Sequence, residues 1–174
     1  MRWRSLIPSE HQEQVAVMQW ADSMQHKLPE VRLLFAIPNG GVRPKFKLFK
    51  KDGIVTFSPE AAKLKAEGVK AGVPDLFLPV ARQEWHGLFI ELKRIKNASL
   101  SLEQDEWIGK LTAQCYAVAV CRGSEDAINA ISGYLMHSTW SPRRSNGSTA
   151  RDRSGKRQNT SFPVCFAHSG TVTD

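Results

Sequence analysis

Residues 72–95 read GVPDLFLPVARQEWHGLFIELKRI, and this stretch decides the fold. It contains two apolar segments, residues 75–80 and 87–95, which have the length and composition of β-strands. Each segment is apolar except for a few charged residues, and these residues lie where the apolar run begins or ends. The arrangement of those charges therefore carries the first information about function.

Asp75 opens the first of these strands, and Glu91 and Lys93 lie near the end of the second. Because side chains alternate between the two faces of a strand, Glu91 and Lys93 share one face and Leu92 lies on the other. If the two strands are neighbours in one sheet, three charged groups meet at one edge of that sheet.

Such a set suits phosphodiester hydrolysis. Two carboxylates, here Asp75 and Glu91, hold a hard cation such as Mg²⁺ through oxygen atoms, and the backbone carbonyl of Leu92 is a further candidate ligand. The cation activates a bound water, and a neighbouring lysine, here Lys93, orients that water and stabilises negative charge. An isolated E-x-K pattern is more often an ion pair on a solvated strand face, so the pattern alone leaves both interpretations open.

The remaining sequence alternates helical and strand patterns. A helix is predicted from Ser9 to about Lys27, followed by a short strand over Leu33–Ile37. Ser58 and Pro59 begin a second helix that stops at Gly68. The other expected elements are a hairpin around Lys51-Asp52-Gly53, a helix capped by Ser99 or Ser101, a strand over residues 116–121 and a last helix capped by Ser124. This order predicts an α/β domain with a central sheet.

The first helix carries two acidic residues near its start. At about 100° per residue, Glu10 projects near the middle of the apolar stripe, with Glu13 and Gln14 on its flanks. A buried acid needs a partner or a cation, which makes Glu10 a candidate metal ligand, either directly or through a water. The geometry is equally compatible with an exposed Glu10 that favours the helix dipole, and with Glu13 as the ligand if the helix phase differs.

Two further patterns have both a structural and a functional interpretation. The triplet Asn39-Gly40-Gly41 forms a plain turn, or its backbone N–H groups approach a phosphate together with Arg43. Gln104 forms a capping box with Ser101, or it is free to face the sheet if Ser99 is the cap.

Length and charge predict one folded domain and a basic tail. A chain of 174 residues is long enough for one domain with a core and too short for two comfortable ones. Of the net charge of +7, residues 1–135 supply 18 basic against 15 acidic residues, and residues 136–174 supply 6 against 2. The second segment has few groups to bury, so we expect a domain over residues 9–135 and a disordered tail over residues 136–174.

The sequence also suggests a compartment. No apolar run approaches the length of a membrane span, and no apolar segment that would indicate a signal peptide follows the first residues. The three cysteines form an odd number without CxxC spacing, which argues against a disulfide framework and against a zinc site. A cytoplasmic protein is therefore expected.

Five sequence words together resemble the VRR-NUC family within the PD-(D/E)xK nuclease superfamily. The similarity spans residues 9–135, and its most specific word is GVKAGVPDL. The matching words are Glu10-x-x-x-Gln14, Ile37-Pro38-Asn39-Gly40-Gly41 with Arg43, LKAEGVKAGVPDL at residues 64–76, GLFIELK at residues 87–93 and SLEQ at residues 101–104.

The resemblance implies a restriction-endonuclease-like fold, with a central mixed sheet flanked by helices, and a nuclease that uses Mg²⁺ or Mn²⁺. It implies that Asp75 and Glu91 bind the metal, that Lys93 is the catalytic lysine, that Glu10 is the acid of the first helix and that Gln104 closes the site. The segment Asn39-Gly40-Gly41 with Arg43 is then expected to contact nucleic acid. Two features depart from the family pattern: an insertion over residues 45–57 and the basic tail.

The expected partner is DNA, including the branched or flapped DNA associated with the family, and no membrane is expected. A homodimer is expected if one domain cuts both strands of a branched substrate. The alternative hypothesis is a non-catalytic nucleic-acid-binding module of the same fold, in which the carboxylates are structural.

Overall fold

The computed structural model describes residues 7–38, 46–50, 53–95, 99–137 and 139–142, and the side chains of residues 47–50 and 53–57 are left out of the description. Its centre is a four-stranded sheet in the order β1-β4-β5-β6. The β1–β4 and β4–β5 pairs are antiparallel and the β5–β6 pair is parallel, so the sheet is mixed, as predicted. The strands are β1 (Phe35–Ala36), β4 (Leu76–Leu78), β5 (Leu88–Lys93) and β6 (Ala117–Arg122).

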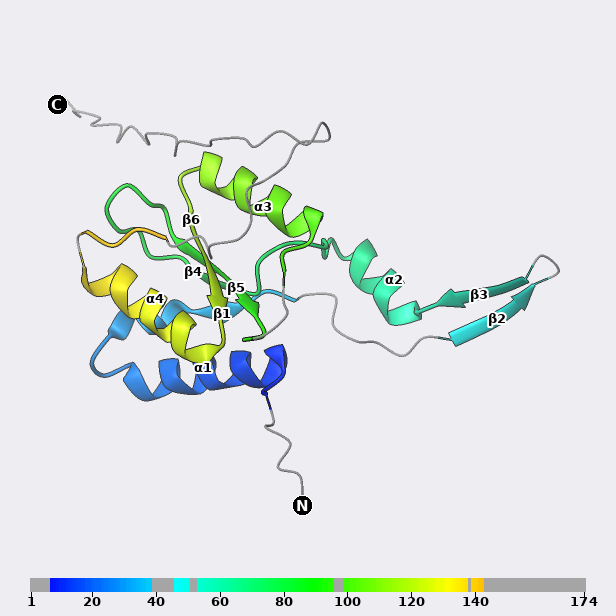
Figure 1. Cartoon of the computed structure of the whole chain (residues 1–174), viewed down its shortest axis with the longest axis horizontal. Coiled ribbons are helices and arrows are strands. Elements are labelled where there is room, and N and C mark those ends of the chain that lie inside the picture. Colours follow the sequence, from blue (N-terminus) through cyan, green and yellow to red (C-terminus); the bar gives the residue numbers. More distant parts are fainter. Residues whose placement is uncertain (1–6, 39–45, 51–52, 96–98, 138, 143–174) are drawn as a thin grey trace, which may run out of the picture.

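Helices cover both faces of this sheet (Figure 1). Helices α1 (Glu10–Met24) and α4 (Ser124–Met136) lie on one face, where they bury the larger core cluster against strand residues such as Leu88, Ile90 and Leu92. Helix α3 (Leu102–Ala113) packs on the other face through Ile108. The alternation of β5 sends Glu91 and Lys93 to the α3 face.

The first helix of the N-terminal segment begins where the sequence predicts, whereas the strand that follows is shorter than predicted. Ser9 caps α1 through a capping box with Gln12. The strand expected over Leu33–Ile37 shortens to β1, because the 3-10 helix η1 (Pro29–Leu33), which has Pro29 in its first turn, occupies its beginning. The chain therefore reaches the sheet only at Phe35.

The insertion forms a hairpin, with β2 (Phe46–Lys50) antiparallel to β3 (Gly53–Phe57), as the sequence predicted, and its turn residues 51–52 lie outside the described residues. Helix α2 (Pro59–Ala66) follows, capped by Ser58, and Gly68 has the positive φ of 94° expected of a helix stop. Figure 1 shows the hairpin extending away from the sheet, with α2 between the two.

The last helix begins differently from the prediction. Gly123, with a φ of 85°, is its N-cap and makes no side-chain hydrogen bond, so Ser124 is the first helical residue and not the cap. The backbone N–H of Ser124 instead donates to the carboxylate of Glu13 on α1 (2.7 Å). An acid from a distant helix thus replaces the local serine cap.

The end of the described chain also packs on the domain. Helix α4 ends at Met136, and the ring of Trp140 lies edge-on to Tyr134, with ring centroids 5.3 Å apart. A Cβ added to Gly133 would lie 2.5 Å from Trp140, so this glycine makes room for the indole. Residues 143–174, most of the segment expected to be disordered, lie outside the described residues.

Two further expectations concern membranes and cysteines. Among the described helices, none combines the length and the apolar character that crossing a membrane requires. Cys121 is free and buried.

Replacing Trp140 by Ala should lower the free energy of unfolding by about 1–2 kcal/mol, because an aromatic contact and partly buried apolar area are lost. Urea titration of the purified protein measures this as a lower midpoint at unchanged slope. Met136→Ala, which removes an exposed side chain from the same segment, is the control and should change little. A chain that ends at Leu135 should show the Trp140→Ala loss, and one that ends at Pro142 should not. Equal midpoints for Trp140→Ala and Met136→Ala would contradict this packing role.

Candidate active site

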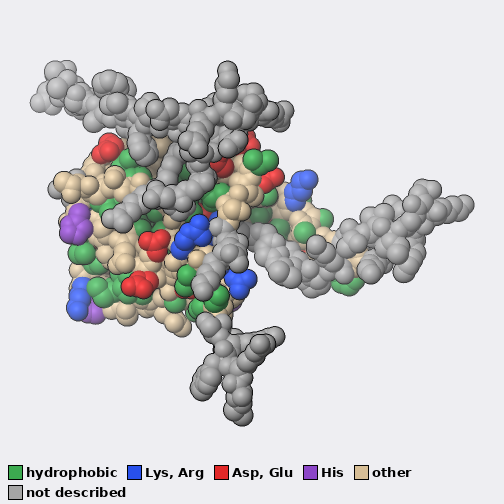
Figure 2. All heavy atoms as spheres, viewed as in Figure 1, with side chains coloured by type: hydrophobic (Ala, Val, Ile, Leu, Met, Phe, Trp, Pro, Cys, Tyr) green, Lys and Arg blue, Asp and Glu red, His purple; other side chains and the backbone are tan. Residues whose placement is uncertain are grey.

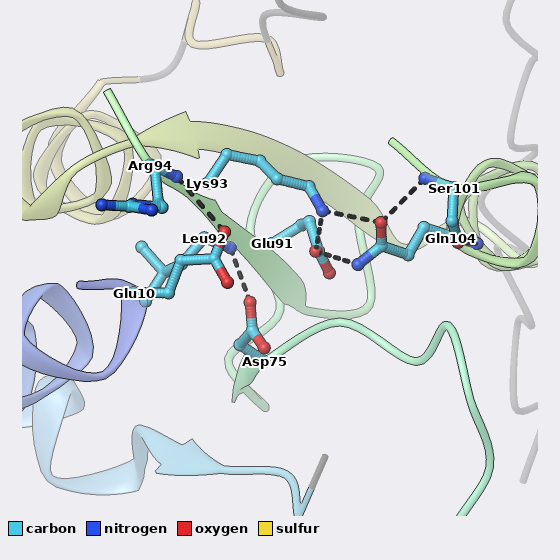
Figure 3. Close-up of polar contacts among 8 residues, drawn as sticks. All are labelled: Glu10, Asp75, Glu91, Leu92, Lys93, Arg94, Ser101 and Gln104. Carbon is cyan, nitrogen blue, oxygen red and sulfur yellow. Dashed lines mark hydrogen bonds and ion pairs between the residues drawn. The ribbon is translucent and has the colours of Figure 1, made fainter. Parts of the chain in front are cut away.

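The structure brings Asp75, Glu91 and Lys93 together at the end of the sheet where β4 begins and β5 ends (Figure 3). Glu91 and Lys93 lie on the same face of β5, and the Lys93 Nζ is 3.1 Å from the Glu91 Oε1. Asp75 immediately precedes β4, and its Oδ2 accepts a hydrogen bond from the backbone N–H of Leu92 (2.7 Å). Since Leu76 pairs with Ile90, the strand register places Asp75 beside Glu91.

Gln104 connects this pair of charged residues to helix α3. Its Oε1 accepts hydrogen bonds from the Lys93 Nζ (2.6 Å) and from the backbone N–H of Ser101 (3.0 Å), and its Nε2 donates to the Glu91 Oε1. The sequence offered a capping box or a free site-facing side chain as alternatives. The structure combines them, because one amide oxygen accepts from both the cap and the lysine.

The two acids of α1 differ in burial. Glu10 is exposed and Glu13 is buried, so of the alternatives that the sequence left open, the structure has the one with an exposed Glu10. The reason is the N-terminus of α4, which lies over Glu13, whereas Glu10 is in the first turn of α1. Glu10 nevertheless reaches the sheet edge, because its Oε1 accepts from the backbone N–H of Arg94 (3.4 Å).

Burial makes Glu91 the most perturbed acid at this edge. Its side chain is 2% exposed, and its pKa is raised to about 7, first by desolvation and then by the charge of Asp75, with Lys93 opposing the shift. Its Oε1 is paired with Lys93 and Gln104, whereas its Oε2 is buried and has no hydrogen-bond partner among the described residues. A buried oxygen of this kind is costly unless something else satisfies it.

These residues line a groove of about 800 Å³. Its lining includes Glu10, Asp75, Glu91 and Gln104 together with residues 68–73. Two exposed lysines, Lys65 and Lys70, also line the groove. Figure 2 shows basic side chains at the α2 end of the domain.

The residue patterns alone did not mark Lys65 and Lys70 as residues of the site. Their presence in the same sequence word as Asp75 was the available signal that they belong near the site. The wall on which Lys70 lies is held by Gly72, whose φ is 86° and where a Cβ would lie 2.6 Å from the backbone of Glu103. Only glycine allows the loop to pack so closely against the first turn of α3.

The segment expected to contact nucleic acid, Asn39-Gly40-Gly41 with Arg43, lies outside the described residues. The described residues that precede it lead to the same edge of the sheet. The backbone N–H of Ile37 donates to the carbonyl of Asp75 (2.8 Å). The chain therefore leaves β1 beside Asp75.

The donor set fits a hard divalent cation. Mg²⁺ usually binds one or two carboxylates and keeps several waters, and Asp75 and Glu91 supply two carboxylates beside the groove. The unpartnered Oε2 of Glu91 is a further feature that a cation would satisfy. Among the described residues, no three His, Cys, Asp or Glu side chains are grouped closely enough to hold a metal by themselves, so water and backbone oxygens would complete the coordination.

A mixed sheet that carries an aspartate, a glutamate and a lysine at one edge defines the core of a PD-(D/E)xK nuclease. A sequence model of the VRR-NUC domain matches residues 8–125, which is more than half of the chain. The chain belongs to the VRR-NUC family, a nuclease family.

A solved structure supports the same assignment. The chain of a VRR_NUC domain protein is 30% identical, with a TM-score of 0.56, and the match covers 74% of this chain and 88% of that chain. No curated protein matches the sequence. The fold expected from the resemblance is thus confirmed.

The two acids of α1 should respond differently to substitution. Glu13→Ala should destabilise the protein by about 1–2 kcal/mol, because it removes the cap of α4 and leaves the N–H of Ser124 unsatisfied. Glu10→Ala, at an exposed position in the same helix, should change stability by less than about 0.5 kcal/mol. Urea unfolding of the two variants measures the difference. Equal losses would mean that Glu13 does not cap α4 in solution.

Proposed function

We propose that this protein hydrolyses DNA phosphodiester bonds with Mg²⁺, for which Mn²⁺ substitutes, at the groove beside Asp75 and Glu91. The observation that carries the proposal is the unpartnered buried oxygen of Glu91 next to a second carboxylate, at the sheet edge of a nuclease-family fold. The Oε1 atom of Glu91 is paired with Lys93 and Gln104, whereas its Oε2 atom is buried without a partner among the described residues. A bound cation would satisfy this second oxygen.

The residues would divide the work as follows. Asp75, Glu91 and the backbone carbonyl of Leu92 would hold the cation, and Glu10 would join them directly or through a water. The bound cation would supply Lewis-acid polarisation of the phosphate and a water of lowered pKa. Leu92 is suited to this place because Asp75 already accepts from its N–H, which fixes the backbone between Glu91 and Lys93.

Lys93 would orient the attacking water and stabilise the negative charge that develops on the phosphate. Lys93 is 8% exposed and its ammonium group is held by Glu91 and Gln104, so it is positioned before substrate arrives. Gln104 acts through these two residues, since it donates to one and accepts from the other. It is therefore a positioning residue for the pair.

Phosphates on either side of the cut would meet the basic residues of the groove. Lys65 and Lys70 are exposed along it and can approach the backbone of a nucleic acid without pairing first with the carboxylates. The segment Asn39-Gly40-Gly41 with Arg43 is proposed to contact DNA as well, because Ile37, the second residue before it, is bonded to the backbone of Asp75. The predicted homodimer stays a prediction.

Conservative replacements should separate catalysis from folding. Asp75→Asn, Glu91→Gln and Lys93→Met should each lower cleavage by at least about a hundredfold, because a cation ligand or the catalytic cation is lost. The substrates are single-stranded, duplex, flapped and four-way DNA with Mg²⁺. Glu84→Gln, an exposed acid between β4 and β5, is the control and should cut like the wild type. Full cleavage by Asp75→Asn or Glu91→Gln would refute the assignment.

The metal requirement has a readout that does not depend on cleavage. Mg²⁺ or Mn²⁺ should raise the melting temperature of the wild type and not that of Glu91→Gln, since a ligand that binds only the folded state stabilises it. Cleavage should stop with excess chelator and return with either ion. Ca²⁺ should support it poorly, because this larger ion takes more ligands in looser geometry. Undiminished cutting in chelator would exclude the mechanism.

A further inference from the structure

A row of aromatic residues lies next to Asp75 and Glu91 on the same face of the sheet. The register pairs Phe35 with Phe77, and Phe77 with Phe89, across β1, β4 and β5. Asp75 and Glu91 are two residues further along β4 and β5 and therefore share that face. A step of two residues along a strand is about 7 Å, so the rings begin one side chain away from the carboxylates.

The rings contact one another across the strands. Phe77 and Phe89 stack with centroids 4.2 Å apart, and the ring of Phe35 stands nearly perpendicular to that of Phe77, at 88° and 5.7 Å. Tyr116 closes the row against Phe89 at 5.4 Å. A Cβ at Gly87 would lie 2.8 Å from the Phe77 ring, so this glycine allows the ring to lie flat across its strand.

The rings of this row are covered at one end and exposed at the other, which distinguishes them from core residues. Helix α3 covers the β6 side of this face through Ile108, which packs with Val118 and Val120. Towards the edge strand β1 the rings become accessible, and Phe35 is 48% exposed. On the opposite face the corresponding residues of β4 and β5, such as Leu76 and Ile90, are completely buried.

The exposed ring of Phe35 is not isolated, because it continues the contacting rings of β4 and β5 onto the edge strand β1. Its location indicates the occupant. A DNA strand whose phosphate lies at Asp75 and Glu91 extends past the neighbouring positions of this face, and the register puts the aromatic row two residues from these carboxylates. Every nucleobase has a π face that stacks on an aromatic side chain.

We propose that Phe35, supported by Phe77, is a stacking subsite for one nucleobase of the strand that is cut. The inference rests on the proposed function and adds a substrate property to it. A base inside a duplex is stacked on both sides, so only an unpaired or flipped base can use the subsite. The nucleotide beside the cut is therefore bound with its base out of the duplex stack.

Binding to a fluorescent single-stranded oligonucleotide tests this, measured by anisotropy with the full chain in excess chelator so that no cutting occurs. Phe35→Ala should weaken binding roughly tenfold, because one stacking contact is lost. On a strand of the same length whose nucleotides are abasic, wild type and Phe35→Ala should bind equally. Phe35→Trp should retain the affinity of the wild type for the strand that carries bases.

Leu33→Ala is the matched control, because Leu33 is an equally exposed apolar residue two positions away (53% against 48%) and carries no ring. It should change affinity by less than about twofold on either strand. Should Phe35→Ala fail to fold, Phe35→Leu removes the ring and keeps the apolar bulk, and the same weakening is expected.

Equal affinities for Phe35→Ala and Leu33→Ala, or an equal loss on the abasic strand, would overturn the subsite. A surface for a protein partner would give the first of these outcomes. The test is separable from the proposed function. Absence of cleavage by the wild type would refute the nuclease activity without changing the binding result, and unchanged binding by Phe35→Ala would refute the subsite in an active enzyme.

Discussion

The negative charge of Glu91 has to be accommodated where water does not reach it, and much of the surrounding structure follows from this constraint. A buried carboxylate needs cationic or hydrogen-bonding partners. Lys93 comes from the next position on the same face of β5, and Gln104 comes from α3. Because Gln104 is also part of the capping box of α3, the helix cannot begin elsewhere without breaking the contacts of Glu91. The start of a helix and the site therefore share one amide group.

The same logic places α1. Glu13 is fixed by the N-terminus of α4, and Glu10 lies one helical turn earlier, where it accepts from the backbone at the end of β5. One acid is thus structural and buried, and the other is exposed beside the groove. Glu13 accepts from Ser124 in the first turn of α4, where the backbone N–H groups have no partner within the helix. Because both acids belong to α1, the contact of Glu13 with α4 also helps to hold Glu10 beside the groove.

Local patterns predicted the strands, because the apolar run that begins at Asp75 and the one that ends near Glu91 need no knowledge of distant residues to be recognised. The alternation along β5 likewise predicted that Glu91 and Lys93 share a face. Other features depend on distant residues and could not be predicted from local patterns. Burial of Glu13 and the loss of the Ser124 cap depend on the packing of α4 on α1, 111 residues apart in sequence. The place of Lys70 in the groove depends on the close approach of Gly72 to the backbone of Glu103, which no periodicity in either segment records.

The acidic and basic side chains that line the groove come from different elements of the fold, and this has a physical consequence. If Lys65 and Lys70 stood beside Asp75 and Glu91, they would pair with the carboxylates, and neither a cation nor a phosphate would gain from binding. Among the described residues, Lys93 is the lysine that pairs with a carboxylate of the site, and its ammonium also donates to Gln104. The other lysines line the groove from α2 and the loop that follows it. A negative centre that attracts a cation and a positive rim that attracts phosphate can then act on one substrate at once, because each keeps its charge until the substrate arrives.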